Sequence, residues 1–145
     1  MESNKYIRFT EIWYQIDAAS SKYFYPKVNK IGLTRGQPKM LRFLKENDGC
    51  RQKDIAERYY LRAASVSTIL NLMERDGLIE RRMNPRSRRE TLVFLTETGR
   101  QKLAQVEMFY SELDQEVFGT FEDEEFEVLM EKLEKVRHFM EQGKQ

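Results

Sequence analysis

Residues 62–95, with the sequence RAASVSTILNLMERDGLIERRMNPRSRRETLVFL, decide the fold. Four apolar side chains recur in the first half of this stretch at helical spacing: Val66, Ile69, Leu70 and Met73. This period predicts an amphipathic helix over residues 62–76, and Gly77 follows in a position where many helices end in a left-handed residue. The opposite face of the predicted helix is polar and carries Arg62, Ser65, Ser67, Thr68 and Asn71.

Two β-prone runs, residues 78–83 and 90–95, follow that helix and flank the hexapeptide NPRSRR at residues 84–89. Asn, Pro and Ser favour turns, so we expect a β-hairpin with this hexapeptide at its tip. The hexapeptide contains three arginines, Arg86, Arg88 and Arg89. Like charges this close repel one another, and phosphate groups would relieve the repulsion and release counterions. The alternative is a turn that only keeps the surface soluble.

Helical periods also mark the chain before this stretch. Apolar and aromatic side chains at steps of three and four predict a long helix over residues 1–26, and Pro26 and Gly32 break this pattern. Thr34 and Gln37 have the spacing of a capping box and predict the start of a second helix. A short third helix is expected over residues 51–59.

Two further helices are expected after the hairpin. Thr96 caps the first, which runs to about residue 117, and Thr120 starts the second with acidic residues in its first turn. The predicted order is four helices, a hairpin and two helices, which is a mainly α fold with a small β-hairpin wing. Two short helices, a helix with a polar outer face and a basic hairpin form the plan of a winged helix-turn-helix.

Positive and negative charges are unevenly distributed along the chain. Residues 27–102 carry 18 Lys and Arg against 9 Asp and Glu, a net charge of +9. The remaining residues carry 7 against 15, a net charge of −8. A cationic middle between acidic flanks indicates an anionic partner for the middle, and DNA is the partner that fits a basic hairpin.

The composition argues against an enzyme, a metal site and a membrane protein. Cys50 is the single cysteine and His138 the single histidine, so a catalytic triad or a zinc site lacks its residues. No catalytic residue, metal ligand or cofactor is therefore predicted. No apolar run approaches the ~20 residues of a transmembrane helix, and the N-terminus lacks a signal-peptide core, so we expect a cytoplasmic protein.

The polar face of the predicted helix over residues 62–76 suits contact with DNA. Serine and threonine can bond to phosphates or base edges, and asparagine can pair bidentately with adenine. We therefore predict that this face reads a major groove. An ordinary amphipathic helix with capping serines is the alternative.

Residues 32–103 resemble the MarR family of bacterial transcription regulators. The similar segments are residues 33–34 with Gln37 and Leu41, and residues 52–57, 64–67, 73–79, 84–89 and 95–100. Their order and spacing match across about half of the chain. The flanking helices match in placement.

This resemblance implies a homodimer on a pseudo-palindromic double-stranded DNA site. The expected domains are an N-terminal dimerisation helix at residues 1–32, a winged helix-turn-helix at 33–96, and C-terminal dimerisation helices at 97–145. The first and last helices also carry more apolar surface than a lone terminal helix can bury, as obligate dimer interfaces do.

The resemblance also implies roles for the wing, and this sequence departs from the family pattern in three places. Arg86 would enter a flanking minor groove. The wing usually begins with Asp, which holds the wing arginine, and here Asn84 stands there, so the order of the free wing is open. Thr68 and Leu72 stand where the family often has Arg, which shifts the expected affinity from the helix to the wing.

Family members commonly bind small aromatic effectors between the dimer helices and the winged lobe. Trp13 and Tyr14 could line such a pocket, although aromatic side chains on a helix more often pack in a core. Some relatives sense oxidants through cysteine, but for Cys50 we favour a half-buried structural thiol.

The sequence therefore predicts a sequence-specific dimeric DNA-binding regulator, a repressor relieved by a small-molecule effector. The alternative is a winged-helix module that binds a protein partner and has little DNA specificity.

Overall fold

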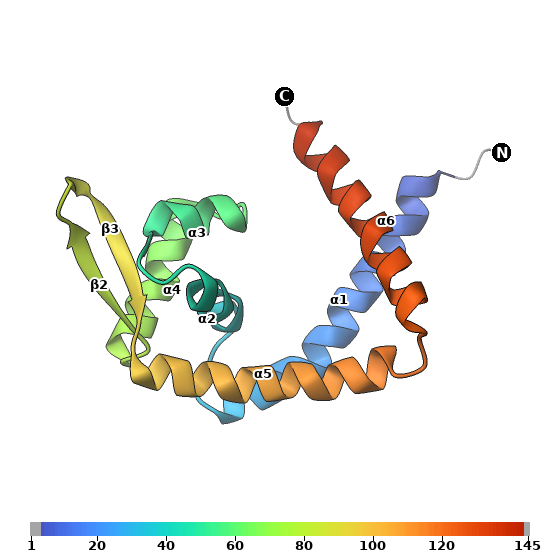
Figure 1. The fold of residues 1–145 in the computed structure, drawn as a ribbon, viewed down its shortest axis with the longest axis horizontal. Helices are drawn as coiled ribbons and strands as arrows, with labels where there is room; N and C mark the ends of the chain where they lie inside the picture. The colour runs from blue at the N-terminus through green and yellow to red at the C-terminus, as the bar shows by residue number, and fades with distance from the viewer. Residues whose placement is uncertain (1–3, 144–145) are drawn as a thin grey trace. The chain divides into compact units, whose positions relative to one another are not determined.

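The computed structural model describes residues 4–143. Within them the helices are α1 (Lys5–Lys30), α2 (Gln37–Glu46), α3 (Gln52–Arg58), α4 (Ala63–Arg75), α5 (Glu97–Phe118) and α6 (Asp123–Gln142). The strands are β1 (Cys50–Arg51), β2 (Ile79–Asn84) and β3 (Ser87–Leu95) (Figure 1). The first and last predicted helices include residues 1–3 and 144–145, which lie outside the described residues.

The chain divides into two compact units, one that ends at Phe109 and one that begins at Tyr110. The first unit holds α1, the winged-helix elements and the first half of α5. The second unit holds the rest of α5 and α6. The mainly α fold with a wing is confirmed, and the hairpin of β2 and β3 lies beside α3 and α4 (Figure 1).

The wing has one strand more than the predicted hairpin. The sheet is antiparallel with the order β1-β3-β2, and Cys50 of β1 pairs with Val93 of β3. On the other side of β3, Ile79 of β2 pairs with Leu95. A strand of two residues is too short to show an alternating pattern, so periodicity did not reveal β1.

The core of the first unit joins the winged-helix elements to α1 and α5. The side chains that are fully or almost fully buried there include Val28, Met40, Leu41, Leu44, Ile55, Val66, Leu70, Met73, Ile79, Val93, Leu103 and Val106. They come from α1, α2, α3, α4, β2, β3 and α5, so one apolar core holds the hairpin and the helices of this unit together. In α6 no residue is buried.

The prediction that the first helix ends at Pro26 is wrong, because α1 continues to Lys30. Proline lacks the N–H that would bond to the carbonyl four residues earlier, which costs the helix one hydrogen bond. Phe24 and Val28 are buried on either side of Pro26, and burial of both offsets that loss.

Two helix starts also differ from the prediction. The backbone N–H of Thr34 donates to Oε1 of Gln37 at 3.0 Å, which is half of the expected capping box, but α2 begins only at Gln37 after Gly36. The last helix begins at Asp123 and not at Thr120, since Glu122 and Glu125 form its capping box.

The predicted end of α4 at Gly77 and the predicted cap of α5 at Thr96 are confirmed. Gly77 follows α4 with φ of 74°, and the hydroxyl of Thr96 accepts from the N–H of Gly99 at 3.0 Å. Between α3 and α4 the chain bends at Tyr60, which has φ of 52°, a conformation unusual for a residue other than glycine. No helix within residues 4–143 combines the length and apolar character needed to cross a bilayer.

Candidate nucleic-acid interface

Helix α4 separates a buried stripe from a polar outer face. Val66, Leu70 and Met73 have no exposed surface, whereas Ser65, Thr68 and Asn71 are exposed, as is Arg62 at the N-cap. Ser67 is only partly exposed. The packing of the stripe therefore fixes which side chains of α4 can reach a ligand.

Hydrogen bonds within the protein already occupy part of this polar face. The hydroxyl of Thr68 donates to the carbonyl of Ala64 at 3.0 Å, so its proton is used within the helix. Oδ1 of Asn71 accepts from the guanidinium of Arg81, a residue of β2. An Asn71 side chain that read adenine bidentately would need the second lone pair of this oxygen, so that predicted contact would have to form beside Arg81.

Arg81 connects β2 to the C-terminal half of α4. Its backbone N–H donates to Oε2 of Glu74 at 2.9 Å, and its Nη2 lies 3.2 Å from Oε1 of the same carboxylate. The Arg81 side chain is 19% exposed. The hydrogen bond from Arg81 holds the pKa of Glu74 below its ordinary range. Arg81 lies on a different element from Glu74 and Asn71, so no helical or strand pattern in the sequence singled it out.

The turn of the wing is tighter than the predicted hexapeptide. β2 extends to Asn84 and β3 begins at Ser87, which leaves Pro85 and Arg86 between the strands. The N–H of Arg86 donates to Oδ1 of Asn84 at 3.0 Å, an Asx turn that closes the tip. Arg88 and Arg89 consequently lie on β3 and not in the turn.

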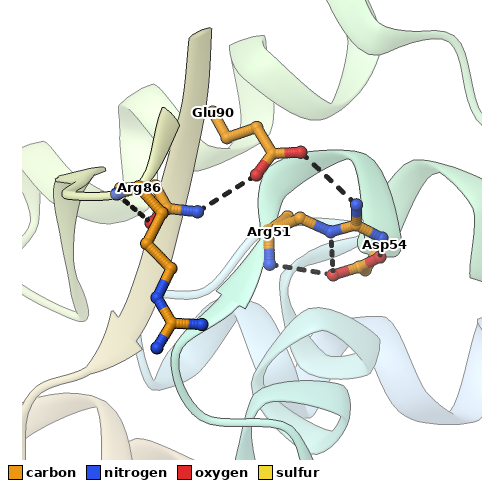
Figure 2. A network of polar contacts seen from close by, with 5 residues as sticks. Arg51, Asp54, Arg86 and Glu90 are labelled. Carbon is orange, nitrogen blue, oxygen red and sulfur yellow. Dashed lines mark hydrogen bonds and ion pairs between the residues drawn. The ribbon is translucent and has the colours of Figure 1, made fainter. Parts of the chain in front are cut away.

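A chain of polar contacts ties this turn to α3 (Figure 2). Nδ2 of Asn84 donates to Oε2 of Glu90 at 3.0 Å, and Oε1 of Glu90 lies 3.4 Å from Nη1 of Arg51. Arg51 in turn contacts Asp54 at 2.6 Å, and this bond lowers the pKa of Asp54. The wing turn is thus held in place by Glu90 and, through Arg51, by the start of α3.

The three wing arginines remain available for a ligand. The side chains of Arg86, Arg88 and Arg89 are exposed and make no hydrogen bond or ion pair within residues 4–143. Figure 2 shows the guanidinium of Arg86 apart from the other side chains drawn. Adjacent strand residues direct their side chains to opposite faces, so Arg88 and Arg89 diverge.

A hollow of about 250 Å³ opens between the starts of α3 and α4 and strand β3. Its lining residues are Arg51, Gln52, Lys53, Ala56, Ala63, Arg89, Glu90 and Thr91. Arg89 and Lys53 bring positive charge to this hollow, and Glu90 is already engaged with Asn84 and Arg51. The surface beside the α4 outer face is therefore cationic and partly concave, which suits a phosphate backbone.

The predicted effector residues lie on α1, and their side chains are exposed. Trp13 is 53% exposed and Tyr14 67% exposed, and the Trp13 ring stacks on Phe9 with centroids 6.0 Å apart. Neither residue lines the hollow at α3.

The Cys50 thiol is partly buried in β1. Desolvation, together with the nearby Asp54 carboxylate, raises its pKa to about 11. A thiol with a raised pKa is protonated at neutral pH, which agrees with the structural interpretation of this residue.

Known proteins are similar to this chain in sequence and in fold. Residues 31–90 match the model of the MarR family. The homoprotocatechuate degradative operon repressor of Escherichia coli is 27% identical over 128 residues, which cover 88% of this chain and 82% of that protein.

Two solved structures superpose closely. A MarR transcriptional regulator from Methanosarcina mazei Go1 has a TM-score of 0.85 at 22% identity, with 95% of this chain and 99% of that chain covered. The S. aureus MepR–DNA complex has a TM-score of 0.81 at 23% identity, with 91% and 97% covered. At these identities the superpositions show a shared winged-helix fold.

Proposed function

This chain belongs to the MarR family of transcriptional regulators, and we propose that it is a sequence-specific, homodimeric DNA-binding repressor. Its relatives are transcriptional regulators and not enzymes. In each protomer, α4 lies in a major groove with Ser65, Ser67, Thr68 and Asn71 toward the bases, and the wing reaches the adjacent minor groove.

The observation that carries this proposal is the state of the wing tip. The Asx turn and Glu90 hold the backbone of the tip, while the guanidinium of Arg86 is exposed and has no partner within residues 4–143. Because the backbone of the tip is already ordered, binding costs only the side-chain entropy of the arginine, and the negative potential of a narrow minor groove attracts its charge. Arg88, Arg89 and Arg62 add contacts with the phosphate backbone.

Unburied apolar faces support the homodimer. Ile12 and Ile16 of α1 are each more than half exposed, and so are Val128 and Phe139 of α6. An obligate dimer interface has this apolar character, and a partner protomer would remove these side chains from water. A two-fold axis between protomers would present two α4 helices to a pseudo-palindromic site.

A small aromatic effector is the proposed release signal, and Trp13 and Tyr14 are its proposed contacts. Support comes from their exposed rings and from the relative whose name refers to an operon of homoprotocatechuate degradation. Trp13 is the single tryptophan of the chain, so its emission reports directly on this site. Hydroxylated phenylacetates should quench it and release bound DNA. Release of DNA with no change in Trp13 emission would place the effector elsewhere.

Selection of bound duplexes from a random pool by the full chain tests the DNA-binding proposal. We expect enrichment of a pseudo-palindrome whose half-sites are about 10 base pairs apart, or a multiple of that spacing. The triple variant Arg86→Ala, Arg88→Ala, Arg89→Ala lacks the wing arginines and should enrich the site poorly. It is compared with the wild-type protein in the same selection. A folded dimer that enriches no common site would contradict the proposal and favour a module that binds a protein partner.

A further inference from the structure

Asn71 on the outer face of α4 has a fixed orientation. Its Oδ1 accepts a hydrogen bond from Nη2 of Arg81. A guanidinium can only donate, so the atom that faces Arg81 must be the oxygen and not the amide nitrogen. The Nδ2 group, with two donor hydrogens, is then the end of Asn71 that is directed away from Arg81.

Arg81 can hold Asn71 because it is itself anchored. Glu74 accepts from both the backbone N–H and the guanidinium of Arg81. Arg81 is also paired in the sheet with Val93, which has no exposed surface. Movement of the guanidinium away from Asn71 would also break its contacts with the Glu74 carboxylate on α4.

We propose, on the basis of the DNA-binding function proposed above, that Arg81 is a positioning residue that makes Asn71 a hydrogen-bond donor to DNA. Guanine, adenine and thymine each present an acceptor in the major groove, whereas cytosine presents only its N4 donor. The base that faces Asn71 can therefore be guanine, adenine or thymine, and cytosine is excluded. The Asn71 side chain alone would instead predict a bidentate preference for adenine.

Selection of sites by the full chain and four variants tests this assignment. Asn71→Ala identifies the base position at which Asn71 acts, because preference disappears there. At that position the wild-type protein should deplete cytosine about fivefold, the lower end of the range for a bidentate base contact, because Asn71 makes a single bond. Asn71→Asp should reverse the preference toward cytosine and adenine, since a carboxylate accepts from the N4 amine of cytosine and the N6 amine of adenine.

The other two variants separate positioning from stability. Arg81→Met removes the donor to Asn71 and should convert the preference at that position to adenine. Glu74→Gln removes the charge of the ion pair but keeps a side-chain oxygen that can accept from Arg81, so Arg81 stays anchored beside Asn71. This variant shares any stability loss and should keep the exclusion of cytosine. If Arg81→Met does not fold, the reversal in Asn71→Asp still decides the assignment.

The outcomes are distinct. A wild-type preference for adenine alone, or a position that tolerates cytosine as well as the other bases, overturns the inference while the DNA-binding function stands. Enrichment of no site by any of the five proteins overturns the proposed function together with the inference.

Discussion

Asn84 illustrates how one side chain sets the order of the wing. Its oxygen accepts from the N–H of Arg86 and its nitrogen donates to Glu90. An aspartate could form the first bond but would place a second carboxylate against Glu90, because aspartate accepts and does not donate. The departure from the family pattern at this position is therefore matched by a different network, in which Glu90 and Arg51 take part.

Arg86→Ala should weaken specific DNA binding at least tenfold, and the slope of log affinity against log salt should become shallower by roughly the release of one counterion. The backbone N–H that closes the turn is retained, so the tip should keep its conformation. Gel-shift titrations at several salt concentrations measure both quantities. Arg75→Ala is the control, because Arg75 is exposed at the end of α4 and paired with Asp76. Equal affinity of Arg86→Ala and wild-type protein would contradict a role for the wing tip.

Cys50 should react slowly with thiol reagents in the folded protein. Its pKa of about 11, raised mainly by burial, leaves little thiolate at pH 8. Iodoacetamide labelling should be much slower than for the denatured chain. Because the folded pKa lies above the ordinary 9.0, the unfolded chain loses its proton first, so this thiol's contribution to stability should fall between pH 9 and about 11. Labelling of the folded protein at the rate of the denatured chain would refute this.

Helix α5 meets the winged-helix core at a glycine. A Cβ added at Gly99 would lie 2.1 Å from the carbonyl oxygen of Leu78, a distance that requires backbone movement. Gly99→Ala should therefore lower the free energy of unfolding by about 1–3 kcal/mol, although alanine favours a helix. Urea unfolding measures the change, and Thr98→Ala, an exposed neighbour in the same helix, is the control. A stabilised Gly99→Ala protein would show that this close approach is absent.

The connection between the wing and α3 depends on Glu90. Glu90→Ala removes the acceptor of Asn84 and one partner of Arg51, so hydrogen exchange at the tip should accelerate. Loss of a negative charge should by itself strengthen DNA binding. If Glu90 positions the wing, specific affinity should nevertheless fall while non-specific affinity rises.

Glu80→Ala is the matched control for this prediction. Glu80 lies on β2, and its ion pair with Arg82 is exposed. This variant removes the same charge without touching the wing turn, so specific and non-specific affinity should rise together. The same pattern in Glu90→Ala would mean that Glu90 contributes only charge.

The molecule as a whole exposes apolar helix faces that a homodimer would cover. Ile12 on α1 is 57% exposed, and a charge placed there would have to be buried in the interface. Ile12→Asp should shift the protein toward monomer in sedimentation equilibrium and weaken operator binding. Met83→Glu is the control, since Met83 is 62% exposed on the wing and the same kind of change there should leave the dimer intact. An intact Ile12→Asp dimer would show that this face of α1 is not in the interface.

The sequence alone determined the features that depend on neighbouring residues. The period of Val66, Leu70 and Met73 predicted α4 and its buried face, and Gly77 predicted where it ends, because helix geometry repeats every few residues. Asn-Pro-Arg at the tip predicted a turn for the same local reason. The order of the helices and the hairpin followed from these patterns, and the cationic middle of the chain followed from the positions of its charged residues.

Only the tertiary structure decided which distant side chains meet. Arg81 lies 10 residues from Asn71, and Arg51 lies 39 residues from Glu90, and neither spacing is a helical or strand period. Such pairs depend on strand register and on how a helix packs against the sheet. The same applies to β1, which is a strand only because β3 is beside it, and to Pro26, which stays helical because Phe24 and Val28 are buried around it. The sequence predicted that Asn71 and the wing arginines are equally available to DNA. In the structure the wing arginines are exposed, whereas the side-chain oxygen of Asn71 already accepts a hydrogen bond from Arg81.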